Sequence, residues 1–289
     1  MNRWILAALV LLPGGQDPGP TGFLLERKVR QKIADLTGRE SEIQRIERVK
    51  IRGQRVSIED ETFGRRLIIR PDLGLAWVID RVDGTYSEVS FDAFAKRRAA
   101  VVEELRAALR RVEGSSDAGP LMDTLLRLGE LPVGMPVSVR STERTEKFDG
   151  RDLLGREVRL GDTISYINVL VDPSLEGALG YFEALSKVGA FNPTVAERLK
   201  QLGGFPMRGE TRYALFFDLV KADEEVTSAA KADLADADFD RPPGLTKVPL
   251  AGVDIVERPK PAKPKNFERS FAEDEIERER NIFRDSEKK

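Results

Sequence analysis

The sequence contains neither cysteine nor histidine in its 289 residues. These two absences exclude disulfides, catalytic sites of the Ser-His-Asp and Cys-His kinds, and zinc sites built on Cys and His ligands. An enzyme made from this chain would need carboxylates, Lys, Tyr, Ser or a metal bound through oxygen alone. No G-x-S-x-G pattern marks a nucleophile. The composition therefore predicts a protein that is not an enzyme and that uses no cofactor and no metal.

No excess of one charge sign is present. Lys and Arg number 47 and Asp and Glu 49, which leaves a formal net charge of −2. A nucleic-acid-binding protein would carry a basic face, so the balance predicts a mixed, solvated surface and no nucleic-acid partner. The chain is 40% hydrophobic and 33% charged, which suffices for one large domain or two modest ones.

Long hydrophobic runs are absent, apart from the residues Trp4 to Leu12 near the start. This run is too short for a membrane span, which needs about 20 residues, but it follows Arg3 and fits the apolar part of a secretory signal peptide. We expect residues 1–20 to be a signal peptide and spacer, and the protein to be periplasmic or extracellular, in a bacterial cell envelope. An uncleaved anchor or a misread start is the alternative.

The stretch Leu67–Phe91 predicts an antiparallel meander of three strands. Turn residues at Pro71–Gly74 and a hairpin signal at Asp83-Gly84 separate them. Upstream, Leu24–Leu36 has a spacing that suits either a helix or a first strand. The next apolar alternation changes parity at Gly53, which predicts one long strand with a bulge or bend.

Helices and further strands follow the meander. The apolar periodicity predicts helices where residues recur at spacings of three and four, and strands where they alternate. A Pro/Lys-rich spacer then begins at Glu257, so we expect a domain over residues 21–256 and a charged, disordered or partly helical tail over 257–289. The expected helices are Asp92–Val112, Leu121–Leu128, Leu175–Val188 and one starting at Asn192-Pro193; the expected strands lie in Val137–Asp172, Met207–Leu219 and Glu225–Leu234.

Several soft motifs resemble those of secreted bacterial domains related to the LolA/LppX-like periplasmic lipoprotein carriers. They are the run Lys50–Arg55, the pair Trp77 and Tyr86, the sequence Leu202–Pro206, the aromatic residues Tyr213, Phe216 and Phe217, and Asp238–Leu245. The resemblance covers about residues 23–250. It implies an α+β fold in which a strongly curved antiparallel β half-barrel has helices covering its concave face. It also implies an apolar cavity that holds acyl chains.

The resemblance and the apolar stripes together nominate residues for the wall of such a cavity. Tyr181 lies beside them on the covering helix. Ordinary core packing is the competing interpretation for each, because cores use the same residue types. The cavity candidates are Leu75, Trp77, Ile79, Leu179, Phe182, Phe191 and Phe216.

Three acidic clusters invite other interpretations. Asp236, Asp238 and Asp240 start like a calcium-binding EF-hand loop, but Arg241 and Lys247 stand where that loop needs Gly and Glu. We therefore predict a polar strand end and turn. The clusters Glu59–Glu61 and Asp223–Glu225 are predicted to be solvated hairpin tips.

We expect a non-enzymatic binding protein that holds a lipid or acyl chain, with a lipid or a lipidated protein as its partner. The alternative is a structural or protein-interaction module with a filled core. Such a module would act through its surface and its charged tail, with another envelope protein as its partner.

Overall fold

The computed structural model describes residues 22–34, 40–128, 130, 137–160, 163–191, 193–215 and 218–250. The predicted signal peptide and spacer, the predicted tail and the cavity candidate Phe216 lie outside these ranges. Within them, no helix is both long enough and apolar enough to cross a bilayer.

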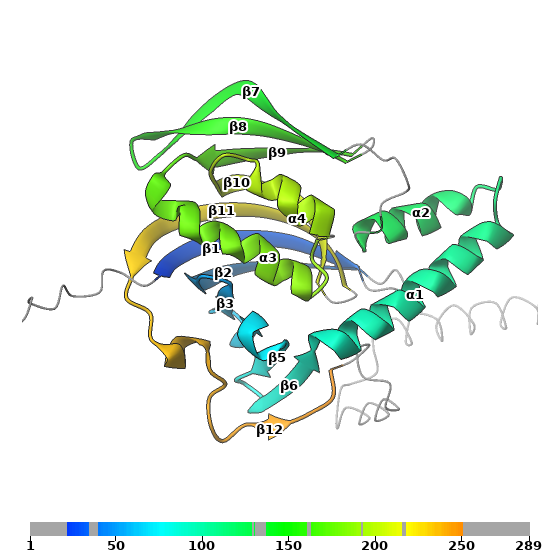
Figure 1. The fold of residues 1–289 in the computed structure, drawn as a ribbon, viewed down its shortest axis with the longest axis horizontal. Coiled ribbons are helices and arrows are strands. Elements are labelled where there is room, and N and C mark those ends of the chain that lie inside the picture. The colour runs from blue at the N-terminus through cyan, green and yellow to red at the C-terminus, as the bar shows by residue number, and fades with distance from the viewer. Residues whose placement is uncertain are drawn as a thin grey trace, which may run out of the picture. The chain divides into compact units, whose positions relative to one another are not determined.

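Twelve strands form one sheet, and the fold is α+β (Figure 1). The strand order is β12-β6-β5-β4-β3-β2-β1-β11-β10-β9-β8-β7. All neighbours are antiparallel except β12 and β6, which are parallel. The strands are β1 (Gly22–Ala34), β2 (Glu40–Arg52), β3 (Arg55–Asp60), β4 (Arg65–Arg70), β5 (Leu75–Asp80), β6 (Thr85–Ser90), β7 (Val137–Phe148), β8 (Arg151–Leu160), β9 (Thr163–Leu170), β10 (Phe205–Leu215), β11 (Asp218–Ala232) and β12 (Thr246–Lys247).

Helices connect the two meanders and cover one face of the sheet. In Figure 1, α3 and α4 lie across the central strands, whereas α1 continues from β6 and packs beside α2. The helices are α1 (Phe91–Arg111), α2 (Ala118–Arg127), α3 (Gly180–Lys187) and α4 (Pro193–Lys200), with the short 3-10 turns η1 (Pro71–Leu73), η2 (Pro173–Leu179) and η3 (Asp236–Phe239).

The predicted order of meander, helices, meander, helices and closing strands is confirmed. The helix-or-strand ambiguity at the start resolves as β1. Its buried residues Leu25, Arg27, Val29 and Gln31 alternate with more exposed ones, which is the period of a strand with one covered face.

The prediction at Gly53 was wrong. The segment is not one bent strand but the hairpin of β2 and β3, with Arg52 paired to Arg55 and Gly53 at a φ of 60°. Antiparallel pairing puts Val49 opposite Ile58 and Ile51 opposite Val56. Residues of odd number on β2 therefore share a face with residues of even number on β3, which explains the change of parity.

Three apolar clusters hold these layers together. The main one lies between the sheet and α3, and includes Val49, Ile51, Phe182 and Leu185. A second, smaller cluster fixes α1 and α2 against β6 through Phe94, Val101 and Leu128. A third contains Trp77 and lies apart from the other two.

The sheet is open, because β12 and β7 are its two end strands. It is neither closed nor strongly curled, so the predicted half-barrel is not confirmed (Figure 1). The helices that pack on one face of the sheet agree with the predicted α+β fold.

Candidate ligand-binding site

A row of charged residues crosses the helix-covered face of the sheet. Strand register places Arg27 opposite Glu47, and Glu47 opposite Asp60. The row continues through Arg65 to Asp80 on β4 and β5. Because paired residues on neighbouring strands point to the same face, five consecutive strands present ionisable side chains beside the main apolar cluster.

Arg27 is the centre of this row, and its side chain is only 8% exposed. Its Nε donates to Glu47 Oε2 at 2.6 Å. Its Nη1 donates to Glu224 Oε2 and to the Tyr181 hydroxyl, both at 2.9 Å. A buried guanidinium is tolerated only with partners of this kind, so Arg27 joins β1, β2, β11 and α3.

Burial shifts the pKa of two of the groups that face Arg27. It raises the pKa of the Tyr181 hydroxyl to about 12, against a smaller opposing effect of Arg27. The phenol, which is neutral at ordinary pH in any case, therefore stays protonated to a higher pH than an exposed tyrosine. Burial also raises the pKa of Glu224, Arg27 lowers it, and the nearby charge of Glu47 raises it further.

A cavity of about 380 Å³ lies over this charged row. Its volume falls within the range of roughly 300–1,000 Å³ that is usual for small-molecule sites. One part of its wall is charged, through Arg27, Arg45, Glu47, Asp60 and Asp80. The other part is apolar. It is formed by Ile33, Ile58, Leu67, Val78, Leu185 and Val220.

A second cavity of about 60 Å³ lies farther under α3 and α4. Its lining is mostly aliphatic and aromatic, and includes Phe182, Phe191 and Phe205. Arg27, Tyr181 and Leu185 border both cavities. The Arg27–Tyr181 hydrogen bond therefore lies where the small apolar space and the larger amphipathic space meet.

The structure divides the predicted cavity residues between two places. Phe182 and Phe191 line the small cavity, and their rings meet edge to face with centroids 6.2 Å apart. Leu179 is half-buried against the main cluster. Leu75, Trp77 and Ile79 belong to the separate third cluster, although Ile79 also borders the larger cavity.

The third cluster is covered by residues 234–247, which we call the strap. Phe239 of the strap is fully buried against Ile68, Trp77 and Ile79. Arg70 Nη1 donates to the Phe239 carbonyl oxygen at 3.2 Å, and the Trp77 indole donates to Glu88 at 3.0 Å. The motif Asp238–Leu245 thus forms part of a structural cover over Trp77.

The calcium-like motif lies in this strap. Asp236 pairs with Arg52 and Arg55, Asp238 pairs with Lys50, and Asp240 pairs with Arg70. The three carboxylates therefore bind different basic side chains. The predicted polar turn is observed as η3.

The prediction of solvated hairpin tips was wrong for Asp60, which is buried, and for Asp223–Glu225, which all lie inside β11 and not at a tip. Asp60 is only 5% exposed, because its Oδ1 accepts hydrogen bonds from the backbone of the following turn. Glu224 lies inside β11, opposite Val29, and not at a hairpin tip. Sequence reasoning missed Arg27, Glu47, Asp60 and Glu224. In the sequence, the only sign of their burial is that they occupy the covered positions of strands in which covered and exposed residues alternate.

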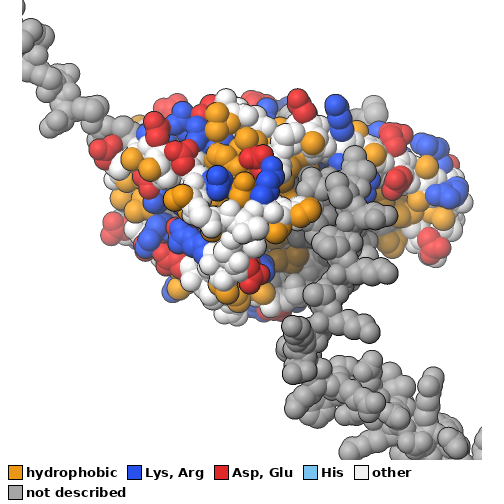
Figure 2. Space-filling model, turned by 90° about the horizontal axis from the view of Figure 1, so that it is seen from below, with side chains coloured by type: hydrophobic (Ala, Val, Ile, Leu, Met, Phe, Trp, Pro, Cys, Tyr) orange, Lys and Arg blue, Asp and Glu red, His pale blue; other side chains and the backbone are white. Residues whose placement is uncertain are grey.

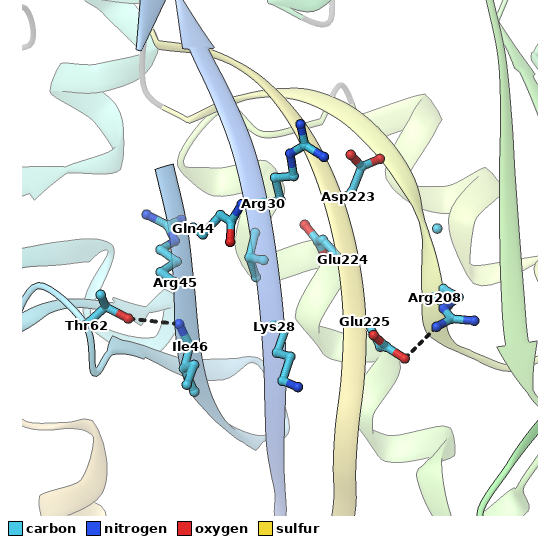
Figure 3. A pocket seen from close by; sticks show the side chains of 12 residues that line it. Lys28, Arg30, Gln44, Arg45, Ile46, Thr62, Arg208, Asp223, Glu224 and Glu225 are labelled. Atoms are coloured by element: carbon cyan, nitrogen blue, oxygen red, sulfur yellow. Dashed lines mark hydrogen bonds and ion pairs between the residues drawn. The ribbon is translucent and has the colours of Figure 1, made fainter. Parts of the chain in front are cut away.

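A further hollow of about 650 Å³ is bordered by β1, β2, β10 and β11 (Figure 3). Charged side chains of both signs surround it, among them Lys28, Arg30 and Asp223, and Arg208 pairs with Glu225 at 2.6 Å. Figure 2 shows basic and acidic side chains mixed over the face that is seen from below. Exposed ion pairs contribute little energy, so the partly apolar cavity over the charged row is the stronger candidate site.

No protein-family model matches the chain, and no curated protein matches it. Among solved structures, it is similar to an uncharacterized conserved protein from Thermus thermophilus, with a TM-score of 0.39, 9% identity, and coverage of 80% of this chain and 91% of that one. It is also similar to PNGF-II, with a TM-score of 0.29 and 8% identity over 78% of this chain; the match spans 31% of PNGF-II.

A LolA superfamily protein from Nitrosomonas europaea has a TM-score of 0.25 and 11% identity, over 77% of this chain and 91% of that one. TM-scores this low support no conclusion about function.

Proposed function

We propose that this protein is a non-enzymatic binding protein of the bacterial cell envelope, which holds a lipid or acyl chain between its sheet and α3. The observation that carries the proposal is the half-open cavity of about 380 Å³ with an apolar wall and a charged wall. A filled core would leave no such space, because protein interiors are packed about as densely as organic crystals.

The arrangement of the walls favours an elongated, amphipathic ligand. Ile58, Leu67 and Val78 are in register on neighbouring strands, so they form a continuous apolar surface beside the charged row. The sequence resemblance to lipoprotein carriers points in the same direction. In this proposal the sheet curves around its ligand as in a half-barrel, and the partner is a lipid or a lipidated protein.

Native mass spectrometry of the full chain, purified from a periplasm without detergent, tests the proposal. We expect an adduct that extracts into organic solvent as lipid. Val78→Phe puts a larger side chain into the cavity wall and should reduce the adduct at least several-fold. Val82→Phe is the matched control, because Val82 is 79% exposed in the turn between β5 and β6.

A protein that carries no adduct and takes up neither added phospholipid nor a fluorescent fatty acid would contradict the proposal. The interaction-module alternative would then take its place. Equal lipid uptake by wild type and by folded Val78→Phe protein would mean that the lipid binds elsewhere.

A further inference from the structure

Asp60 lines the larger cavity, and its carboxylate oxygen Oδ2 is buried at the cavity wall. The side chain is 7% exposed, and its Oδ1 accepts hydrogen bonds from the backbone N–H groups of Thr62 at 2.9 Å and Phe63 at 3.1 Å. In the part of the chain that the structure describes, no donor forms a hydrogen bond with Asp60 Oδ2. Arg45 Nη1 is 3.7 Å from it, which exceeds hydrogen-bond length.

Three of the four arginines that line the cavity pair with carboxylates, and the fourth, Arg66, donates to the Ser57 hydroxyl and to the Asp238 carbonyl oxygen. Arg27 binds Glu47 and Glu224. Arg45 Nε lies 2.5 Å from Glu47 Oε1, and Arg65 Nε lies 3.5 Å from Asp80 Oδ2. A ligand that enters this end of the cavity therefore meets an acceptor in need of a donor.

The acceptor Asp60 Oδ2, which lacks a donor, favours some ligand head groups over others. A buried acceptor without a donor is costly, and a hydrogen bond to a charged group is stronger than one between neutral groups. An ammonium or hydroxyl group would satisfy Asp60 Oδ2, whereas a carboxylate head would meet a like charge. The apolar chain of such a ligand could continue over Ile58, which lies two residues before Asp60 on the same strand face.

We propose, building on the proposed function, that the cavity binds an amphiphile whose head group donates a hydrogen bond to Asp60 Oδ2, in preference to a fatty acid. The shared chemistry is an N–H or O–H donor on an apolar chain. An aliphatic amine and a monoacylglycerol are its two simplest sources.

Displacement of a neutral fluorescent apolar probe from the full chain tests the preference, with dodecylamine, monolaurin and laurate as competitors below their aggregation concentrations. Wild-type protein should bind dodecylamine or monolaurin about tenfold or more tightly than laurate. Which of the two binds better identifies the source of the donor.

Asp60→Asn keeps the Oδ1 acceptor and the side-chain volume, but it replaces Oδ2 with a donor. We expect it to lose most of the preference and to bind laurate more tightly than wild type does. Asp172→Asn is the matched control, since Asp172 also accepts from a backbone N–H, that of Ser174, but does not line the cavity. Near-ultraviolet circular dichroism verifies that each variant is folded.

The outcomes separate the two proposals. If all three amphiphiles bind equally, or laurate binds best, the inference about Asp60 is overturned while the binding function stands. If Asp60→Asn keeps the wild-type preference, Asp60 is not the recognition group. If wild type binds neither the probe nor any amphiphile, both proposals fail. Should Asp60→Asn not fold, the wild-type order of the three competitors still decides.

Discussion

Arg27 shows how one side chain can join distant parts of a chain. Its hydrogen bonds reach Glu47 on β2, Tyr181 on α3 and Glu224 on β11. The guanidinium also lies 5.7 Å from the centre of the Tyr181 ring, within the range of a cation–π interaction. The position of α3 on the sheet therefore depends in part on a charge inside the main core.

Replacing Arg27 with an uncharged residue should lower the free energy of unfolding. Arg27→Met leaves Glu47 and Glu224 without their shared partner, and breaking a buried ion pair costs about 3–5 kcal/mol. Arg30→Met is the control on the same strand, because the Arg30 side chain is 57% exposed and should cost less than about 1 kcal/mol. Urea unfolding measures both. Equal losses would show that Arg27 is not a structural centre.

Glu224 gives the protein a dependence on pH. Its pKa is raised by burial, so between the ordinary value and the raised value the folded protein keeps a proton that the unfolded chain has released. In that window the free energy of unfolding falls as pH rises. Glu224→Gln has no such proton, so its free energy of unfolding should fall less than that of wild type above about pH 4.

Urea unfolding of both proteins at several pH values measures this difference. Glu225→Gln provides the control, since Glu225 is the exposed neighbour on the same strand. A wild-type curve that runs parallel to that of Glu224→Gln at every pH would contradict the assignment.

These residues also mark the limit of prediction at the site. The sequence correctly placed Tyr181, Phe182 and Phe191 on or beside a covering helix. It did not reveal Arg27 or Glu47 as buried, because charged residues are rarely found inside unless they are paired. Their partners lie on strands far away in sequence, and only the register brings them together.

The strap is the least obvious element of the fold. It has little regular structure, yet Phe239 is completely buried and the last pairing joins β12 to β6. Phe239→Ala should destabilise the protein by about 3–5 kcal/mol, as expected for a large aromatic side chain removed from a core.

Phe63→Ala is the matched control for that change, because Phe63 is 44% exposed. Thermal or urea unfolding followed by the fluorescence of Trp77, which packs against Phe239, measures the effect. If Phe239→Ala and Phe63→Ala cost the same, the strap does not stabilise the fold.

The elements themselves were largely predictable, and the exceptions have simple causes. At β1, Leu25, Val29 and Ile33 are four residues apart, a spacing common to a helix and to alternate positions in a strand. At Gly53 a change of parity fits a bulge as well as a tight hairpin. In β5 the alternation was right, but it could not say that Trp77 faces the strap and not α3.

The arrangement of the sheet was the hardest part to foresee. Most neighbours follow sequence order, which favours short connections. The two exceptions, β1 beside β11 and β12 beside β6, have no local signal. The first exception brings Val220 of β11 to the cavity and Glu224 of β11 to Arg27. A sequence pattern could therefore suggest an apolar site but not its charged wall.

The pairing of β1 with β11 also affects how the chain assembles. Gly22 pairs with Ala232, so the first strand made is among the last to obtain its second neighbour. Contacts this distant in sequence slow folding. Until β11 arrives, one edge of β1 stays open to pairing with other chains. The exposed positions of β1 carry Lys28, Arg30 and Lys32. These positive charges lie along the open edge and oppose its pairing with other chains until β11 is in place.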